Sequence, residues 1–174
     1  PQFYINAFTH PKTPVITNVK RNQLQRYQWG LIPSWSKKDE IKKYTLNAKI
    51  ETLNEKPSFR DSIQNRCLVI SNGFYEWKWL DPKGKLKKKY FIKVKNQEVF
   101  VFAGIWSHWI HPETAELIKT YTILTTSANP LMAEIHNSKK RMPVIIHPKD
   151  YEKWLDGMDI ELDANELDIS EADS

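Results

Sequence analysis

The sequence has few of the residues that build disulfides, metal centres or nucleotide-binding loops. Cys67 is its only cysteine, so no internal disulfide can form, and this favours a reducing compartment. Four of its five histidines have no acidic or thiol neighbour at the spacing of metal ligands: His10, His108, His111 and His147. The sequence contains neither a glycine-rich phosphate loop nor a Gly-x-Ser-x-Gly motif. These absences exclude the familiar zinc, P-loop and serine-hydrolase signatures.

Long apolar runs are also missing. No stretch approaches the roughly 20 residues that a membrane-spanning helix needs, and no signal-peptide pattern opens the chain. The 174 residues are 40% hydrophobic and 27% charged, which is typical of a globular domain with a sizeable core. No internal repeat is evident. We therefore predict one domain over residues 1–155 and an acidic C-terminal tail over residues 156–174.

Charge is distributed unevenly along the chain. Residues 156–174 contain eight acidic residues and no basic one, although the whole chain has a net charge of +5. Since 26 basic and 13 acidic residues remain in residues 1–155, that part carries +13. A body this basic favours a polyanionic partner, nucleic acid first, while a solvated lysine-rich surface is the alternative. The tail is expected either to screen the body as a mobile end or to act as a solubilising segment.

Short apolar or alternating runs separated by turn residues predict a chain dominated by strands. These strands are predicted over residues 3–8, 14–17, 23–28, 66–71, 77–80, 85–94, 98–106, 121–126 and 144–146. Residues 45–52 fit either an extended segment or a turn of helix. Many short strands with few helices predict an α+β single domain with mainly antiparallel, curved or barrel-like sheets.

Turn and cap residues divide these strands. Asp81-Pro82-Lys83-Gly84 has the residue order of a type I turn and predicts a hairpin with a basic tip. Residues 127–131 contain cap-forming Ser and Asn followed by Pro, so we predict a short helix that ends near Ile135. A second capped helix is predicted over residues 147–155.

The stretch from Asn72 to Lys78 is the most informative part of the sequence. It follows a predicted buried strand, which Asn72-Gly73 interrupts because glycine accepts backbone angles that other residues resist. Glu76 then lies between Tyr75 and Trp77. A carboxyl group among aromatic rings loses hydration, which favours its neutral form and prepares it for proton transfer. A surface glutamate on a half-exposed strand is the alternative.

Two further features point toward nucleic acid. Trp29 and Trp35 flank a glycine and a proline in a shaped loop, where they are able to stack on bases, with core packing as the alternative. His136 precedes the basic cluster Lys139-Lys140-Arg141, so it suits phosphate contact or proton shuttling. A structural histidine is the alternative there.

Six motifs in order carry a resemblance to a known family. They occupy residues 29–35 (WGLIPSW), 47–52 (NAKIET), 66–78, 102–106, 122–126 and 135–145. Over residues 3–155 the sequence closely resembles the SRAP family, the SOS-response-associated peptidases. The resemblance implies the SRAP fold and a sensor of abasic sites in single-stranded DNA. In that family an N-terminal cysteine attacks the ring-opened sugar aldehyde, giving a Schiff base and then a thiazolidine crosslink, and an autopeptidase activity exposes this cysteine.

The resemblance assigns roles to three catalytic residues. Asn47 would position the N-terminal residue or the sugar, and Glu76 would act as the acid and base in Schiff-base chemistry and crosslink reversal. His136 would assist ring opening and hold the adjacent phosphate. The resemblance also implies a monomer without cofactor, metal or membrane partner, in the bacterial cytoplasm with the nucleoid.

The remaining residues carried over are expected to contact DNA. They are Trp29, Trp35, Lys49, Thr125, Arg141, Pro11 and Asn6. Lys49 stands where the family usually has arginine, so it keeps the charge but loses the bidentate geometry. The spacing between His136 and Arg141 is expanded, and the spacing between Asn6 and Pro11 is longer than usual.

The sequence departs from the family at its start, where Pro1 and Gln2 stand and the opening Cys-Gly-Arg-type segment is missing. Cys67 is no substitute, because it lies in a predicted buried strand without a free α-amine. We expect a fragment that keeps the groove and Glu76 but does not crosslink. If Pro1 is a processed terminus instead, its secondary amine is able to form an iminium with an aldehyde but cannot close a thiazolidine ring. A non-catalytic binder of single-stranded or junction DNA is the alternative, and a peptidase acting on other proteins is a third.

Overall fold

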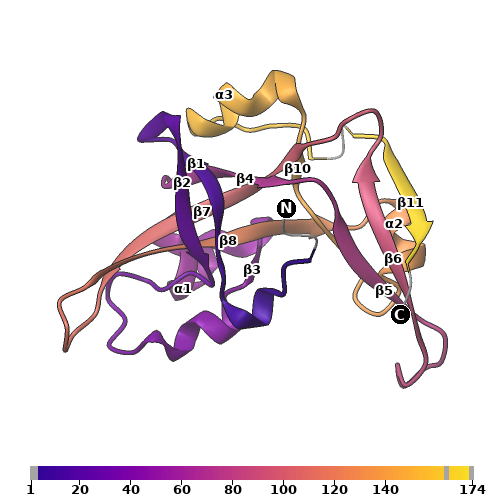
Figure 1. The fold of residues 1–174 in the computed structure, drawn as a ribbon, viewed down its shortest axis with the longest axis horizontal. Helices are drawn as coiled ribbons and strands as arrows, with labels where there is room; N and C mark the ends of the chain where they lie inside the picture. The colour runs from indigo at the N-terminus through magenta and orange to yellow at the C-terminus, as the bar shows by residue number, and fades with distance from the viewer. Residues whose placement is uncertain (1–3, 163–164, 173–174) are drawn as a thin grey trace.

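The computed structural model describes residues 4–162 and 165–172, and strands dominate it (Figure 1). The strands are β1 (Lys12–Thr17), β2 (Lys20–Trp29), β3 (Asn47–Lys49), β4 (Arg66–Ser71), β5 (Phe74–Trp79), β6 (Lys87–Val94), β7 (Phe100–Ile110), β8 (Leu117–Ser127), β9 (Arg141–Pro143), β10 (Ile145–Ile146) and β11 (Leu167–Glu171). The helices are short: η1 (Ala7–Thr9), η2 (Asp39–Tyr44), η3 (Ile50–Glu55), α1 (Pro57–Arg60), α2 (Pro130–Ile135), η4 (Pro148–Asp150) and α3 (Tyr151–Leu155), where η marks a 3₁₀ helix.

Five strands close into a barrel. The order β7–β4–β1–β2–β8 returns to its start because β7 also pairs with β8, and β3, β9 and β10 extend the rim. Most pairs are antiparallel, but β2 and β3 run parallel to β8. Gly104 is required where β7 lies between β4 and β8, since a Cβ there would come within 2.8 Å of the Cys67 sulfur. The predicted α+β, barrel-like fold is confirmed.

Apolar side chains fill two cores on the two faces of the barrel wall. One cluster draws residues from all five barrel strands and therefore lies inside the barrel; it includes Val15, Tyr27, Cys67, Phe102 and Tyr121. The other cluster lies between the outside of the wall and the helices η3, α1 and α3. This division follows from the strand alternation, in which neighbouring residues face opposite sides. Cys67 is fully buried, as the sequence predicts.

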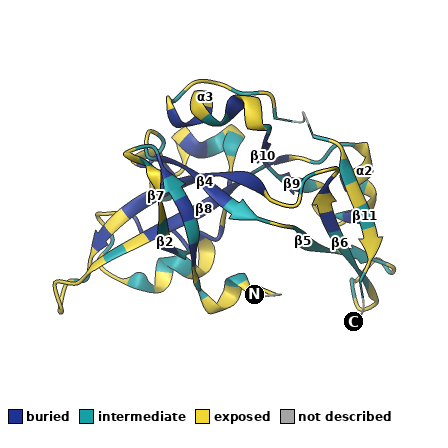
Figure 2. Ribbon diagram, turned by 45° about the horizontal axis from the view of Figure 1, so that its top comes forward, coloured by how far each residue is buried: buried dark blue, intermediate teal, exposed yellow. Residues whose placement is uncertain are grey.

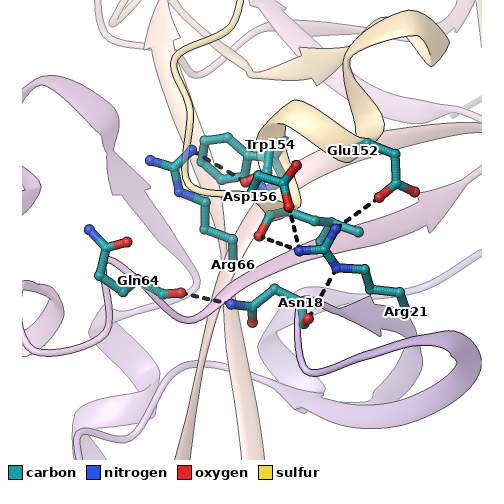
Figure 3. A network of polar contacts seen from close by, with 8 residues as sticks. Asn18, Arg21, Gln64, Arg66, Glu152, Trp154 and Asp156 are labelled. Atoms are coloured by element: carbon teal, nitrogen blue, oxygen red, sulfur yellow. Dashed lines mark hydrogen bonds and ion pairs between the residues drawn. The ribbon is translucent and has the colours of Figure 1, made fainter.

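Charged residues fix α3 to the outside of the barrel (Figure 3). The Arg66 guanidinium lies 4.1 Å from the centroid of the Trp154 ring and donates to the Met158 carbonyl at 2.7 Å. Arg21 bridges Glu152 at 2.9 Å and Asp156 at 2.7 Å. We refer to this arrangement as the α3 dock.

A second sheet, with strand order β11–β6–β5, stands beside the barrel and continues directly from β4 (Figure 1). Asn72 and Gly73 separate β4 from β5, and a Cβ at Gly73 would lie 2.2 Å from the Phe91 ring. The hairpin between β5 and β6 contains the predicted turn, since the Gly84 N–H donates to the Asp81 carbonyl at 3.1 Å. This layout places β5 against α2, which also contacts β9.

Two predictions need correction, and one open alternative is resolved. The acidic tail contains strand β11, whose Leu167 and Ile169 pack on the second sheet while Glu166 and Glu171 pair with lysines of the β6 region. Favourable pairing with this basic neighbour explains why an acidic segment folds here. Residues 3–8 do not form the predicted strand: η1 begins at Ala7, and Phe3 lies outside the described residues. Residues 45–52 contain both predicted alternatives, β3 followed by η3.

Candidate active site at the barrel rim

Four of the predicted site residues stand beside strand β8, each paired in register with one of its residues. The pairing partners in order are Trp29 with Tyr121, Asn47 with Ile123, Lys49 with Thr125 and Arg141 with Ser127. Since a strand rises about 3.3 Å per residue, these partners span about 20 Å of β8. The parallel register of β2 and β3 and the antiparallel register of β9 therefore bring three separate motifs into one row beside β8, which the sequence suggests only through their order.

Glu76 and His136 approach this row from β5 and from the end of α2. Their side chains are about one-fifth exposed, and Glu76 Oε2 lies 4.0 Å from His136 Nδ1. Burial raises the pKa of the Glu76 carboxyl, while His136 and the Trp77 N–H, which donates to it at 3.3 Å, act in the opposite direction. The predicted loss of hydration at Glu76 is confirmed.

The tautomer of His136 is fixed by its backbone partner. Nδ1 lies 2.7 Å from the Arg141 carbonyl oxygen, and because a carbonyl only accepts, Nδ1 carries the hydrogen. Among the described residues Nε2 has no hydrogen-bond partner. The Asn129 cap of α2, which accepts from the Met132 N–H at 2.8 Å, helps to orient the helix that ends at this histidine. Nε2 is therefore free to accept or transfer a proton.

Asn137 holds the end of α2 against β5. Its side-chain carbonyl accepts from the Trp79 N–H at 3.0 Å, and its amide donates to the Trp79 carbonyl at 2.9 Å. This two-point contact keeps the neighbouring His136 close to Glu76. Sequence reasoning missed Asn137, because only its position beside His136 marks it and its partner lies 58 residues earlier.

Arg141 is engaged by Glu51 in a bidentate ion pair. The two distances are 3.0 and 2.8 Å, and the guanidinium also donates to the Thr125 carbonyl at 2.7 Å. Arg141 and a hydrogen bond from Thr126 lower the pKa of Glu51 to about 2. The charge of Arg141, a predicted DNA contact, is thus neutralised by Glu51 in this structure. Sequence reasoning gave Glu51 no role in the site, although Glu51 stands only two residues after Lys49.

The two tryptophans have different surroundings. Trp29 is half-buried: its ring stacks on Tyr121 and its indole N–H donates to the Leu46 carbonyl at 2.8 Å. Trp35 is 51% exposed, and among the described residues its side chain makes neither a hydrogen bond nor an aromatic ring contact. Trp29 therefore shapes the wall of the site, while Trp35 is available for an external ring.

The remaining predicted contacts are structural in this state. The Pro11 carbonyl accepts from the Trp29 N–H at 3.0 Å. Asn6 caps η1, where its side chain accepts from the Phe8 N–H at 3.0 Å. Across residues 4–162 and 165–172 no group of three or more metal-binding side chains converges, and no helix is long and apolar enough to cross a membrane.

Comparison with known proteins places this chain in a family. The model of the family "SOS response associated peptidase (SRAP)" matches residues 2–172, a range that includes β11. The chain belongs to the SRAP family. The predicted resemblance is thereby confirmed, and the match extends beyond the predicted boundary at residue 155.

Two named proteins and one solved structure are similar to most of this chain. The abasic site processing protein YoqW of Bacillus subtilis is 44% identical over 142 residues, which cover 81% of this chain and 61% of YoqW. The abasic site processing protein HMCES of Gallus gallus is 32% identical over 76% of this chain and 45% of its own length. This chain therefore spans about three-fifths or less of these relatives. A crystal structure from Bacteroides thetaiotaomicron superimposes with a TM-score of 0.87 and 38% identity, covering 98% of this chain and 77% of that protein.

Proposed function

We propose that this chain forms the DNA-binding and proton-transfer part of an SRAP protein that processes abasic sites in single-stranded DNA. The observation that carries the proposal is the Glu76–His136 pair. A desolvated carboxyl group lies 4.0 Å from an imidazole whose tautomer is fixed and whose Nε2 has no partner among the described residues. Perturbed carboxyl groups beside a histidine are typical of acid–base sites.

The chemistry follows from the aldehyde of a ring-opened abasic sugar. An N-terminal amine adds to this aldehyde, and the resulting carbinolamine loses water when neutral Glu76 protonates its hydroxyl group. The product is an iminium, to which the thiol of the same N-terminal cysteine adds, while Glu76 recovers the proton. The ring that forms is a thiazolidine. The raised pKa of Glu76 suits both proton transfers.

The cysteine for this reaction is the family's N-terminal one and is not among the residues of this sequence. Cys67 does not replace it: its thiol is fully buried inside the barrel, and burial raises its pKa. Autopeptidase activity, a monomeric state and a place in the bacterial nucleoid belong to the same proposal.

The row along β8 supplies the DNA contacts. Asn47 and Lys49 are exposed on the edge strand β3, where they suit the sugar and a phosphate. Arg141 takes a phosphate if the incoming anion displaces Glu51. Trp35, with half of its surface exposed, suits stacking on a base.

A two-protein crosslinking assay tests the proposal. This chain and a version that restores the family's opening segment, with cysteine at its N-terminus, are incubated with single-stranded DNA that carries one abasic site. On a denaturing gel, only the restored version is expected to shift. Failure of both to shift, with binding to undamaged DNA retained, favours a non-catalytic single-stranded or junction DNA binder, for which the basic body is the supporting observation. Failure of both to bind contradicts both accounts.

A further inference from the structure

Strand alternation gives β5 two chemically different faces. Glu76 lies on the face toward α2, so its neighbours Tyr75 and Trp77 point to the opposite side of the sheet. The antiparallel register places Phe91 across from Tyr75 and Lys89 across from Trp77. The sheet therefore carries a block of aromatic rings and lysines directly behind the carboxyl group that the proposed function uses.

This outer face is accessible. Trp77 is 37% exposed, and most residues of β5 and β6 are intermediate or exposed, in contrast to the buried strands β7 and β8 (Figure 2). The Tyr75 and Phe91 rings lie 4.9 Å apart, and the Tyr4 ring lies 5.4 Å from Tyr75. Large rings gathered on an accessible sheet face indicate a binding surface more than a core.

Lysines surround these rings at cation–π distance. Lys89 Nζ lies 4.5 Å from the Tyr75 ring, Lys93 Nζ lies 5.3 Å from Phe91, and Lys87 Nζ lies 5.5 Å from Trp79. Within the described part of this sheet, Asp168 on β11 is the one acidic residue in register with this face, across from Lys93. A surface on which lysines alternate with aromatic rings is complementary to a nucleic acid, whose phosphates are negative and whose bases are flat.

We propose that the outer face of the β5–β6 hairpin binds single-stranded nucleic acid, with bases stacking on Tyr75, Trp77 and Phe91 and phosphates pairing with Lys87, Lys89 and Lys93. Alternating aromatic and basic side chains on an open sheet face bind strands without sequence preference. Because β5 is the edge strand of its sheet, a bound nucleic acid has to cross only the width of β5 to run from the Glu76 face to this outer face. The inference rests on the proposed function and adds a second contact to it.

Binding of an undamaged 15-nucleotide oligothymidylate, followed by fluorescence anisotropy, tests the stacking part. Trp77→Leu is expected to weaken binding about 10-fold, whereas Trp77→Phe, which keeps a ring, retains most of it. Thermal unfolding of both variants checks that the fold is unchanged. Equal affinity of wild type and both variants overturns the inference.

Salt dependence tests the charge part. The double variant Lys89→Gln/Lys93→Gln is expected to reduce the slope of log affinity against log salt by about 1.4, since each phosphate contact to a single strand contributes about 0.7. Lys20→Gln, at the start of β2 on the barrel, is the control and leaves the slope unchanged. An unchanged slope in the double variant contradicts the inference.

The two proposals fail separately. If Asn47→Ala abolishes crosslinking to an abasic site by the restored protein while Trp77→Leu binds undamaged DNA normally, the outer face is wrong and the proposed function stands. If Trp77→Leu weakens binding but the restored protein never crosslinks, the outer face stands and the abasic-site chemistry is wrong.

Discussion

Two regions of this protein withdraw charged side chains from water, and they treat those charges differently. At the α3 dock, Arg66 stacks on Trp154 and donates to the Met158 carbonyl, although its buried Nε has no hydrogen-bond partner within the part of the chain that the structure describes. At the barrel rim, Glu76 has one backbone N–H at 3.3 Å and a histidine at 4.0 Å. A charge with close fixed partners holds elements together. A carboxyl group with loose partners and a raised pKa retains the capacity to exchange a proton.

The largest effect is expected at the α3 dock. Trp154→Ala removes the ring beneath Arg66 and the indole hydrogen bond to the Cys67 carbonyl at 3.0 Å, and it leaves a cavity in the outer core. The free energy of unfolding is expected to fall by about 3–5 kcal/mol. Urea denaturation measures it. A loss below about 1 kcal/mol would show that α3 is not held by this contact.

At the rim, the corresponding change acts on chemistry instead of stability. In the version with an N-terminal cysteine, Glu76→Gln is expected to slow crosslink formation or reversal about 100-fold, the usual range for a lost acid–base group. Binding to undamaged single strands stays within about 2-fold, because no charge of the β8 row is altered. Gel-based rates and anisotropy provide the two readouts. Equal loss in both readouts removes Glu76 from the catalytic residues.

The pH profile sharpens the same test. The neutral form of Glu76 donates the proton that releases water, so the wild-type rate of iminium formation is expected to fall as pH rises through the raised pKa of this carboxyl. Glu76→Gln is expected to lose this dependence. A variant that keeps the wild-type pH profile assigns the titration to another group.

The sequence predicts the elements that depend on local pattern. The strand before Asn72, the turn Asp81–Gly84 and the helix start near Asn129 rest on apolar runs and cap residues, and each is confirmed. The motif order and the family resemblance together indicate the barrel-like architecture. The sequence also predicts the desolvation of Glu76, but strand alternation turns Tyr75 and Trp77 to the opposite face, so the burial of Glu76 comes from the packing of β5 against α2 and not from these two rings.

Other features depend on partners far along the chain and escape such reasoning. The Glu51–Arg141 pair joins residues 90 positions apart, and Asn137 reaches Trp79 across 58 positions. In β11 the alternation of apolar and polar residues is too short to predict a strand in so acidic a segment. The strand forms because β6 offers lysines and an apolar face. Register between distant strands, which no local pattern encodes, decides all three.

Asn137, which positions His136, is expected to affect both the stability of the fold and the rate of crosslinking. Asn137→Ala removes both hydrogen bonds to Trp79, so the free energy of unfolding is expected to fall by about 1–2 kcal/mol. The crosslinking rate is expected to fall about 10-fold, because His136 is no longer held close to Glu76. Denaturation and gel rates measure the two effects. Asn129→Ala, which weakens the other end of α2, is the control: an equal rate loss there would assign the effect to helix stability alone.

The smallest effects separate two rim glutamates by the sign of their pH dependence. Glu51 has a lowered pKa of about 2, so its stabilisation is complete above its unfolded pKa and is lost as pH falls through about 2. Glu51→Gln is therefore expected to destabilise by about 1 kcal/mol at pH 7, since solvent screens this partly exposed pair, and the difference vanishes in acid.

Glu76 has a raised pKa, so the sign reverses: the stability linked to its neutral form is complete below the unfolded pKa and is lost as pH rises through the folded pKa. Glu76→Gln is therefore expected to gain stability relative to wild type as pH rises through the raised pKa of Glu76, whereas the deficit of Glu51→Gln develops between about pH 2 and the unfolded pKa of the carboxyl group, roughly 4.3, and stays constant above it. Urea denaturation at about pH 3, 4, 6 and 8 measures both, with exposed Glu113→Gln as the control. Parallel profiles for the two rim variants would mean that both carboxyl groups serve the structure. Opposite profiles separate the residue that holds β9 from the residue that moves protons.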